Sequence, residues 1–363
     1  MDNARLLARK LFIKFPILQA PMAGGSTSPA LAAAVSNAGG LGSIAGGYLS
    51  PDKLRAEIKE TRTLTKSSFA VNLFTPLSNP VPTASQFARA NALLDPYRKE
   101  LGLGLNPPAP EKYCEDLTAQ LQVVLEERPS VFTFTFGMPP ESFLHECKNE
   151  NIVTIGTATH IEEAVALEKA GVDMVFAQGY EAGGHRGTFI GDFHDARIGL
   201  TALVPQLVQA VKIPVIAAGG IMHGSQVAAA LAMGASGVSL GTAFLLCPEA
   251  STNQPYRATL KSPDARFTEV SRVYSGRYAR GIRNRFMVEM EKNAGDIPEY
   301  PIQNAMTREI RTASAKAGKA DFLSLFAGQG VTLIRELPAK ELVETLIAET
   351  FSAVQKVQFV IGL

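Results

Sequence analysis

Eight short apolar segments alternate with stretches of helical periodicity along this 363-residue chain. Most of the segments are nearly continuous in apolar residues, as expected for parallel strands that are covered on both faces. Eight strands alternating with helices favour an α/β fold closed into a (β/α)8 TIM barrel, and an open doubly wound sheet is the alternative. The segments are PILQAPM (16–22), LGSIAG (41–46), SFAVNLF (68–74), VFTFTF (131–136), IVTIGTA (152–158), MVFAQG (174–179), PVIAAGG (214–220) and GVSLGTAF (237–244).

Capping residues indicate where the intervening helices begin and end. Ser28 followed by Pro29 predicts the start of a helix over 28–40. Thr159, with Glu162 three residues later, predicts the start of a second helix over 159–172. A third helix is expected over 225–235.

Two regions are too long for simple barrel connections. Residues 76–130 contain proline-rich loops, among them TPLSNPVPT (75–83), and two helical patterns. Residues 248–330 follow the eighth strand and contain a polar segment with strand character. We predict a barrel over 1–247 with a helical insertion around 76–130, and a small additional domain over 248–330 packed on the barrel's top face. Residues 331–363 are predicted to form a C-terminal helix that returns to the barrel.

Composition narrows the expected partners and compartment. The net charge of +1 lacks the basic excess of a nucleic-acid-binding protein. The N-terminus has no signal-peptide pattern, and no apolar run reaches the ~20 residues of a membrane span. Cys114, Cys147 and Cys247 are far apart and odd in number, which argues against a disulfide scaffold. We expect a cytoplasmic protein without nucleic-acid or membrane partners.

Small and amide residues close five of the predicted strands. In a barrel, the carboxyl ends of the strands and the loops that follow them form the functional face. Residues at these five positions are therefore expected to share one pocket. They are Met22, Asn72, Gln178, Gly219 with Gly220, and Gly241 with Thr242.

The last two strand ends predict a phosphate site. Gly219 and Gly220 precede a helix, and SLGTAF (239–244) repeats the arrangement with the amides of Leu240 and Gly241 and the hydroxyl of Thr242. Glycine lets backbone N–H groups approach an anion, and a helix N-terminus adds its dipole. The alternative is that these glycines serve only tight turns.

The ligand expected at this phosphate site is a phosphorylated ring cofactor such as FMN. The amides of Asn72 and Gln178 can both donate to and accept from the edge of a flat heteroaromatic ring. Neither a GxGxxG fingerprint with a downstream acid nor a GxxxxGK[ST] loop is present.

GYEAGGHRG (179–187) places His185 among four glycines directly after a predicted strand. Flanking glycines let the backbone pass close to a ligand while the imidazole projects toward it, and an imidazole can take up a proton. The alternative role of this histidine is as a metal ligand, in a site formed by His185, His194, Asp192 and Asp195. Because no HExxH or paired-histidine spacing is present, we expect no metal.

Four segments together resemble the nitronate monooxygenase family, also called 2-nitropropane dioxygenase, and are most similar to its class I enzymes. They are QAPMAGGSTSPALAAAVSNAGGLGSIAGG (19–47), AQGYEAGGHRG (177–187), AAGGI (217–221) and SLFAGQG (324–330). The resemblance implies an FMN enzyme that oxidises alkyl nitronates, such as propionate 3-nitronate, with O2 to a carbonyl compound and nitrite. It implies an anionic nitronate and O2 as partners, and an oligomer is possible.

The resemblance also assigns roles to individual residues. His185 matches the family's histidine, which is similar in role to a base acting on neutral nitroalkanes. Phe326 stands where the family often has Trp, and Gln329 is expected near the cofactor. Tyr300 and Arg308 match a segment near the substrate. The FMN positions fall on Asn72, Gln178, Gly183, Gly220, Ser239, Leu240, Gly241 and Thr242, and more loosely on Met22.

Three rival functions are open at this point. An FMN-dependent NAD(P)H reductase, acting on an enoyl-acyl carrier or a quinone, shares the glycine-rich strand ends but needs a nicotinamide donor. An IMP-dehydrogenase-like enzyme needs a cysteine nucleophile, for which Cys247 is the candidate. A sensor would bind FMN or phosphate without turnover.

Overall fold

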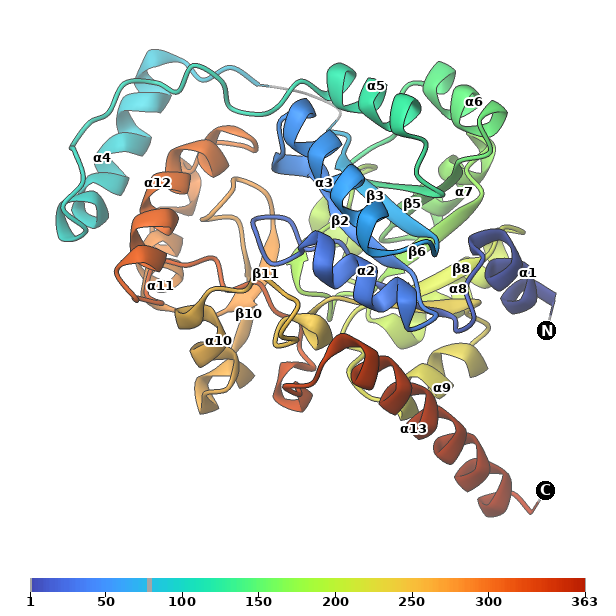
Figure 1. Ribbon diagram of the computed structural model, residues 1–363. Helices are drawn as coiled ribbons and strands as arrows, with labels where there is room; N and C mark the ends of the chain where they lie inside the picture. The colour runs from blue at the N-terminus through green and yellow to red at the C-terminus, as the bar shows by residue number, and fades with distance from the viewer. Residues whose placement is uncertain (1, 77–79, 363) are drawn as a thin grey trace.

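The computed structural model describes residues 2–76 and 80–362, and its largest element is an eight-stranded parallel sheet (Figure 1). The strand order is β1-β9-β8-β6-β5-β4-β3-β2, and a parallel bridge between Leu18 and Leu41 brings β1 beside β2. The sheet is therefore a nearly closed barrel, so the (β/α)8 prediction is confirmed and the open sheet is wrong. The strands are β1 (Ile17–Gln19), β2 (Gly42–Ala45), β3 (Phe69–Phe74), β4 (Val131–Thr135), β5 (Val153–Ala158), β6 (Met174–Gln178), β8 (Val215–Ala218) and β9 (Gly237–Leu240).

Helices surround this barrel. Seven of them connect successive strands: α2 (Pro29–Asn37), α3 (Pro51–Leu64), α5 (Leu117–Glu127), α6 (Glu141–Asn149), α7 (Ile161–Lys169), α8 (Leu200–Ala210) and α9 (Gly224–Ala232). The C-terminal helix α13 (Ala339–Val360) packs against α9 and α2 and so fills the remaining position of the ring (Figure 1). Its buried residues, which include Leu342 and Leu346, all lie in its first half.

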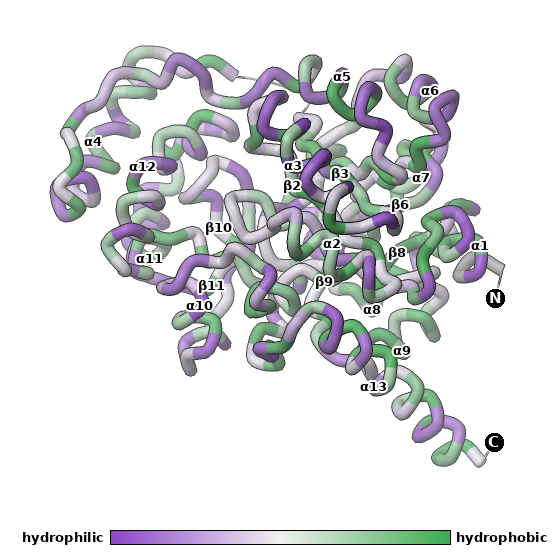
Figure 2. Tube along the Cα trace, in the orientation of Figure 1, coloured by the Kyte–Doolittle hydropathy of each residue, from purple (hydrophilic) through white to green (hydrophobic). Residues whose placement is uncertain are grey.

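The amino end of the barrel is closed by a helix that the sequence patterns did not predict. Helix α1 (Asp2–Leu11) places Leu7 and Leu11 in one apolar cluster with strand residues that include Ile155 and Ile216. This packing closes the amino end, which leaves the carboxyl ends of the strands as the open face of the barrel. In the hydropathy-coloured tube, the strands of the barrel are predominantly apolar (Figure 2).

The predicted helix starts are accurate to within one residue. The Ser28 side chain accepts a hydrogen bond from the Leu31 amide at 3.0 Å, as a capping residue should. Thr159 is not the cap of α7, where His160 takes that position. The Thr159 hydroxyl instead donates to Glu163 at 2.7 Å. The buried carboxylate thus competes successfully for the side chain that would have capped the helix.

A side unit lies against the barrel and is formed by α4, α11, α12 and a small antiparallel sheet (Figure 1). The sheet has the order β10-β11-β7, and β7 (Gly184–His185) comes from the loop after barrel strand β6. This pairing connects the side unit to the loop that carries His185. The bounds are α4 (Ala84–Glu100), β10 (Thr268–Ser271), β11 (Ala279–Ile282), α11 (Arg285–Glu291) and α12 (Ile302–Lys316), with α10 (Gln254–Leu260) beside them.

The region 76–130 divides between the barrel and the side unit. Leu94 and Tyr97 of α4 share an apolar cluster with Phe286 and Ile310, whereas α5 packs on barrel helix α3. Of the proline-rich loop 75–83, residues 77–79 lie outside the described residues. The domain limits at 247 and 330 stay a prediction.

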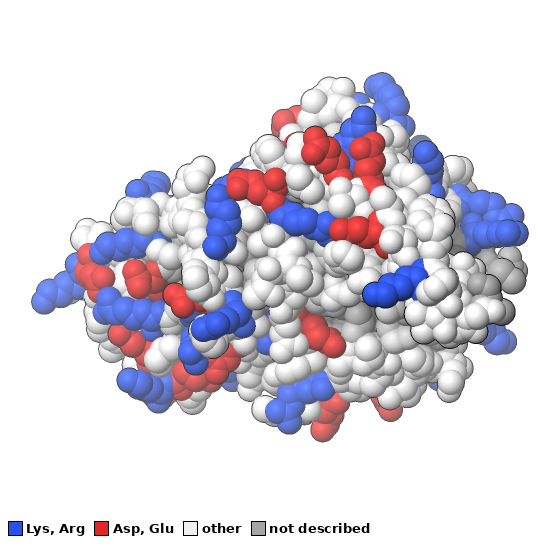
Figure 3. Space-filling view, turned by 90° about the horizontal axis from the view of Figure 1, so that it is seen from below, with Lys and Arg blue, Asp and Glu red and all other residues white. Residues whose placement is uncertain are grey.

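The surface carries charges of both signs. On the face seen from below, Lys and Arg side chains are interspersed with Asp and Glu over the side unit (Figure 3). In the described part of the chain, no helix is both long enough and apolar enough to cross a bilayer.

Candidate active site

A cavity of about 740 Å³ opens at the carboxyl ends of the barrel strands and extends to α12 of the side unit. Its volume is within the range of cofactor sites, which is roughly 300–1,000 Å³. All ten residues predicted for the site line this cavity: Met22, Asn72, Gln178, Gly183, His185, Gly220, Ser239, Leu240, Gly241 and Thr242. Phe326 and Arg308 also line it, whereas Gln329 does not.

One side of the cavity is formed by backbone. Gly219 and Gly220 follow β8 with φ angles of +132° and +68°, which side-chain-bearing residues rarely adopt. Gly241 follows β9 and precedes the short 3-10 helix η3 (Thr242–Phe244). Among the described residues, the amides of Gly219, Gly220, Gly241 and Thr242 donate no hydrogen bond. Several unpartnered N–H groups on two neighbouring loops form a surface that suits an anion.

Two glycine-rich segments pack backbone to backbone on the next part of the rim. A Cβ atom at Gly183 would lie 2.5 Å from the Gly328 amide nitrogen, so no larger residue fits there. The Thr242 hydroxyl accepts a hydrogen bond from the same Gly328 amide at 3.0 Å, and the Gln329 amide donates to the Glu181 carbonyl at 2.9 Å. The segment 324–330 is thereby fixed against the loop after β6. Gln329 takes part through its backbone, and its side chain is exposed.

The predicted amide residues are already partly engaged with protein groups. Gln178 donates from Nε2 to the His185 carbonyl at 2.9 Å and accepts from the Gly187 amide at 2.8 Å. Asn72 donates from Nδ2 to Thr133 Oγ1 at 3.0 Å. Each of these two side chains can still form further hydrogen bonds. The existing bonds of Gln178 also fix the conformation of the loop that carries His185.

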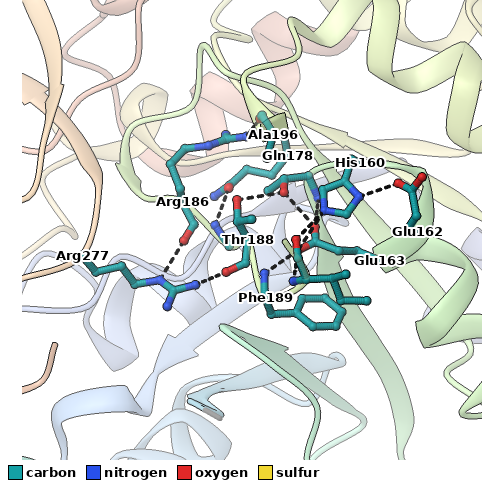
Figure 4. Close-up of polar contacts among 12 residues, drawn as sticks. His160, Glu162, Glu163, Gln178, Arg186, Thr188, Phe189, Ala196 and Arg277 are labelled. Atoms are coloured by element: carbon teal, nitrogen blue, oxygen red, sulfur yellow. Dashed lines mark hydrogen bonds and ion pairs between the residues drawn. The ribbon is translucent and has the colours of Figure 1, made fainter. Parts of the chain in front are cut away.

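Two buried charged side chains hold the loop after β6 from either side (Figure 4). The Arg186 guanidinium donates to the carbonyls of Gly179, Gln178 and Ala196 at 2.6–3.1 Å. Glu163, fully buried in α7, accepts from the amides of Phe189 and Ile190, as well as from Thr159. Because Arg186 and Glu163 bond to the loop and not to each other, they fix its backbone and thereby the position of His185.

The hydrogen bonds around His185 favour one tautomer. Its Nε2 lies 2.8 Å from the hydroxyl oxygen of Ser275, in the hairpin between β10 and β11. That hydroxyl donates to the Arg277 carbonyl at 3.0 Å, so it accepts from His185. The proton of the neutral ring is therefore on Nε2, and Nδ1 keeps its lone pair. Among the described residues Nδ1 has no hydrogen-bond partner, which leaves it available to a ligand.

The surroundings of His185 keep it uncharged. Burial, together with the positive charges of Arg277 and Arg311, lowers the pKa of His185 to about 3. Four aromatic rings, of Phe74, Phe136, Tyr300 and Phe326, lie with centroids 5.1–6.2 Å from the imidazole. A neutral imidazole at pH 7 acts as a hydrogen-bond partner or a base, and not as an imidazolium.

Several residues around His185 were missed by the sequence patterns. Ser275 and Arg277 come from the hairpin of the side unit, and Arg311 lies three residues after Arg308 on α12. Arg277 donates to the carbonyls of Arg186 and Thr188 (Figure 4). Its guanidinium carbon lies 4.1 Å from the centre of the Phe136 ring. Tyr48 follows β2 and could have been found by the same strand-end rule that indicated Asn72.

The structure also bears on the other sequence alternatives. Over residues 2–76 and 80–362, no three His, Cys, Asp or Glu side chains are grouped so that they could hold a metal ion. The His194 ring makes edge-to-face contacts with Phe193 and Tyr278, and the Asp192 carboxylate accepts a hydrogen bond from the His194 amide. Cys247 is buried outside the cavity lining, and burial raises the pKa of its thiol to about 12. A buried thiol of that kind is a poor nucleophile.

One cavity of the nearly closed barrel contains both the two loops of unpartnered amides and the neutral histidine. These features define a barrel enzyme with a site suited to a phosphorylated ligand. Comparison with known proteins narrows this class. The chain belongs to the nitronate monooxygenase family, whose model matches residues 5–349. Members of this family are oxidoreductases that are generally flavin-dependent.

Individual relatives span nearly the whole chain. A probable nitronate monooxygenase of Staphylococcus aureus (strain MSSA476) is 44% identical over 348 residues, which are 96% of this chain and 97% of the relative. The solved structure of nitroalkane oxidase from Streptomyces ansochromogenes is 42% identical, with a TM-score of 0.89 over 96% of this chain and 99% of that one. FabK from Thermotoga maritima is 30% identical, with a TM-score of 0.77 over 98% of both chains.

Proposed function

We propose that this protein binds FMN and oxidises alkyl nitronates, with propionate 3-nitronate among them, using O2 to give a carbonyl compound and nitrite. The observation that carries the proposal is the cavity in which unpartnered backbone amides face a neutral, oriented histidine. Membership of the nitronate monooxygenase family supports the reaction class.

The residues present fit FMN. The phosphate suits the unpartnered amides of Gly219, Gly220, Gly241 and Thr242, because each can donate to an anion without losing a protein partner. The ring suits the region between Asn72, Gln178 and Met22, where amide groups retain hydrogen-bonding capacity beside an apolar side chain. When bound, FMN supplies the redox chemistry by accepting electrons from the substrate.

The side chains around His185 bind and orient the substrate. A nitronate is already an anion, and the guanidinium groups of Arg277 and Arg311 make this end of the cavity electropositive. The aromatic side chains of Phe74, Phe136 and Phe326 surround the imidazole and exclude water. A nitronate needs no proton removed, so His185 is dispensable for that substrate in principle.

For a neutral nitroalkane, His185 has a second task. Its Nδ1 lone pair accepts a proton from the carbon next to the nitro group, while Nε2–H stays bonded to Ser275. The resulting imidazolium is transient, because its surroundings disfavour a positive charge. We therefore expect nitroalkanes to be slower substrates than the corresponding nitronates.

Anaerobic spectroscopy of the purified flavoprotein tests the proposal. In one cuvette the protein is mixed with propionate 3-nitronate, and in a second with NADPH. We expect the nitronate alone to change the visible flavin spectrum, and nitrite to be released once O2 is admitted. Bleaching by NADPH with no response to the nitronate would assign the chain to the NAD(P)H reductases instead. Bound flavin with no response to either compound would favour a sensor.

A further inference from the structure

The C-terminal helix α13 lies beside α9 and reaches the loop that joins β8 to α9 (Figure 1). Glu349 of α13 accepts a hydrogen bond at 2.9 Å from the amide of Gly224, the first residue of α9. The two helices approach so closely there that a Cβ atom at Gly224 would clash with the Thr350 amide nitrogen. A helix N-terminus attracts negative charge, and that of α9 holds a carboxylate of the protein itself.

Arg335 and His223 connect the same carboxylate to the loop. The Arg335 guanidinium donates from Nη1 to Glu349 at 2.6 Å and from Nη2 to the Met222 carbonyl at 2.6 Å. His223 Nδ1 accepts a hydrogen bond from the Ser225 amide at 3.1 Å, so the proton of the neutral ring is on Nε2. That Nε2 lies 3.1 Å from the Glu349 carboxylate. Residues 222–224 are therefore fixed to the C-terminal segment by several contacts with one ion pair.

The charges of this ion pair balance each other. Burial raises the pKa of Glu349, but hydrogen bonds from Arg335 and from the Gly224 amide outweigh burial and bring the pKa below its ordinary value. The carboxylate is thus ionised at neutral pH, and the Arg335 guanidinium offsets its charge. This balance matters because an unpaired carboxylate would repel an anion bound at the free amides of the same loop.

The free amides lie directly before the fixed segment. The Met222 and His223 amides donate to the side-chain oxygen of Gln226 at 2.8 and 3.1 Å. Gln226 in turn donates to the Gly220 carbonyl at 3.1 Å. In the described part of the chain, the Gly219 and Gly220 amides donate no hydrogen bond. Because glycine has wide conformational freedom, the direction of these two amides depends on the segment that follows them.

We propose that Glu349 and Arg335 are positioning residues for the cofactor phosphate. They fix residues 222–224 and thereby orient the free amides of Gly219 and Gly220 toward the phosphate. Neither side chain lines the cavity, so both act through the loop. A loop that is already oriented binds its ligand more tightly, because less conformational freedom is lost on binding. This inference rests on the proposed binding of FMN and extends the cofactor site to the C-terminal helix.

A comparison of FMN with riboflavin, which lacks the phosphate, tests the inference. Full-length protein loaded with either flavin is diluted, and the fluorescence of the released flavin gives each dissociation constant. In Glu349→Ala we expect Kd for FMN to rise about tenfold, the effect of losing a hydrogen bond to a charged group, and Kd for riboflavin to stay within about twofold. Glu349→Gln keeps an acceptor for the Gly224 amide and should recover part of the loss. Equal weakening of both flavins, or unchanged binding of FMN, would overturn the proposal.

Arg335→Gln tests the charge balance. It leaves the Glu349 carboxylate unpaired, so we expect FMN to bind at least as weakly as in Glu349→Ala. The double variant Arg335→Gln/Glu349→Gln should bind FMN more tightly than Arg335→Gln, because the repelling charge is removed. A double variant that binds FMN no more tightly would overturn the role assigned to Arg335. Glu344→Ala, at an exposed glutamate of the same helix, is the control and should change neither dissociation constant. An equal loss of FMN affinity in this control would show that only the overall charge of α13 matters, against the proposal.

These binding measurements do not depend on turnover. A wild-type protein that prefers FMN to riboflavin but oxidises no nitronate would refute the proposed reaction alone, and the variants would still decide the role of Glu349 and Arg335. A wild-type protein that binds neither flavin, or binds both equally, would refute the phosphate site and this inference together.

Discussion

The two sides of the cavity are built on different principles. The loops after β8 and β9 present backbone amides from glycine-rich turns, whereas the wall around His185 presents side chains from the barrel and the side unit. A backbone site depends on the absence of side chains, and a side-chain site depends on segments far apart in sequence. Substitutions in the glycine loops should therefore impair ligand binding by steric obstruction. Substitutions around His185 should impair it by removing individual chemical groups.

Substitutions at the glycine loops should have the largest effect. Gly220 has φ +68°, and a Cβ there would lie 3.0 Å from the Glu181 Cβ. We expect Gly220→Val to distort the loop and give protein without flavin, measured as the flavin absorbance per protein after purification. Unchanged flavin content would contradict the phosphate placement.

Gly241→Ala distinguishes obstruction of a ligand from damage to the fold. A Cβ at Gly241 would meet only Ala20 and Met22, at 3.6 Å or more, and its φ of −104° suits any residue. The protein should fold normally while FMN binds about tenfold or more weakly, because one amide can no longer approach the phosphate. Gly104→Ala, at an open and exposed glycine, is the matched control. Normal FMN affinity in Gly241→Ala would show that the phosphate does not bind at this loop.

These two sides were not equally predictable from sequence. The glycine loops and strand ends were identified because apolar runs ending in Gly, Asn or Gln are local patterns, while the family resemblance added Gly183 and Ser239. All ten predicted positions line the cavity. Ser275 and Arg277 were missed because they come close to His185 only through the pairing of β11 with β7. Arg311 was missed because it reaches the cavity only through the position of α12, which packs on α4. Local sequence periodicity does not predict such contacts between segments that are distant in the sequence. Helix α1 was missed as well, since its ten residues carry no distinctive cap.

The His185 side should respond selectively. His185→Asn removes the base while keeping a polar side chain, so we expect nitroalkane oxidation to fall by about 10²- to 10⁴-fold, the usual contribution of a general base. Nitronate oxidation should change much less, because that substrate carries no proton to remove. Steady-state kcat/KM for nitroethane and ethylnitronate measures the ratio. Equal losses would show that His185 positions the substrate or the flavin and does not act as a base.

The pH dependence of stability probes the neutral state of His185. Its pKa is about 3 in the folded protein and about 6.5 when unfolded, so below pH 6.5 only the unfolded chain takes up the proton. The stabilisation is complete above pH 6.5 and decreases as pH falls toward 3. Relative to His185→Gln, the wild type should lose up to about 1.4 kcal/mol per pH unit, measured by denaturant unfolding between pH 7 and 4.5.

His145→Gln, at an exposed histidine, is the control for this titration. Its stability should run parallel to that of the wild type across the range. If the curve of His185→Gln were also parallel, His185 would ionise in the folded protein as readily as in the unfolded chain. The aromatic enclosure would then not be keeping the imidazole neutral.

Ser275→Ala should give the smallest change and tests whether the side unit sets the tautomer of His185. Without the hydroxyl acceptor, the ring proton is free to occupy either nitrogen, so part of the population loses the Nδ1 lone pair. We expect nitroalkane kcat/KM to fall by about fivefold, the value of one hydrogen bond, with nitronate oxidation unchanged. Ser271→Ala removes another buried hydroxyl of the same hairpin, bonded to Glu291, and should leave the ratio of the two activities unaltered. If both variants lowered the two activities alike, the hairpin would support the site through packing alone, and the orientation of His185 would depend on the barrel loop and its Arg186 and Glu163 contacts.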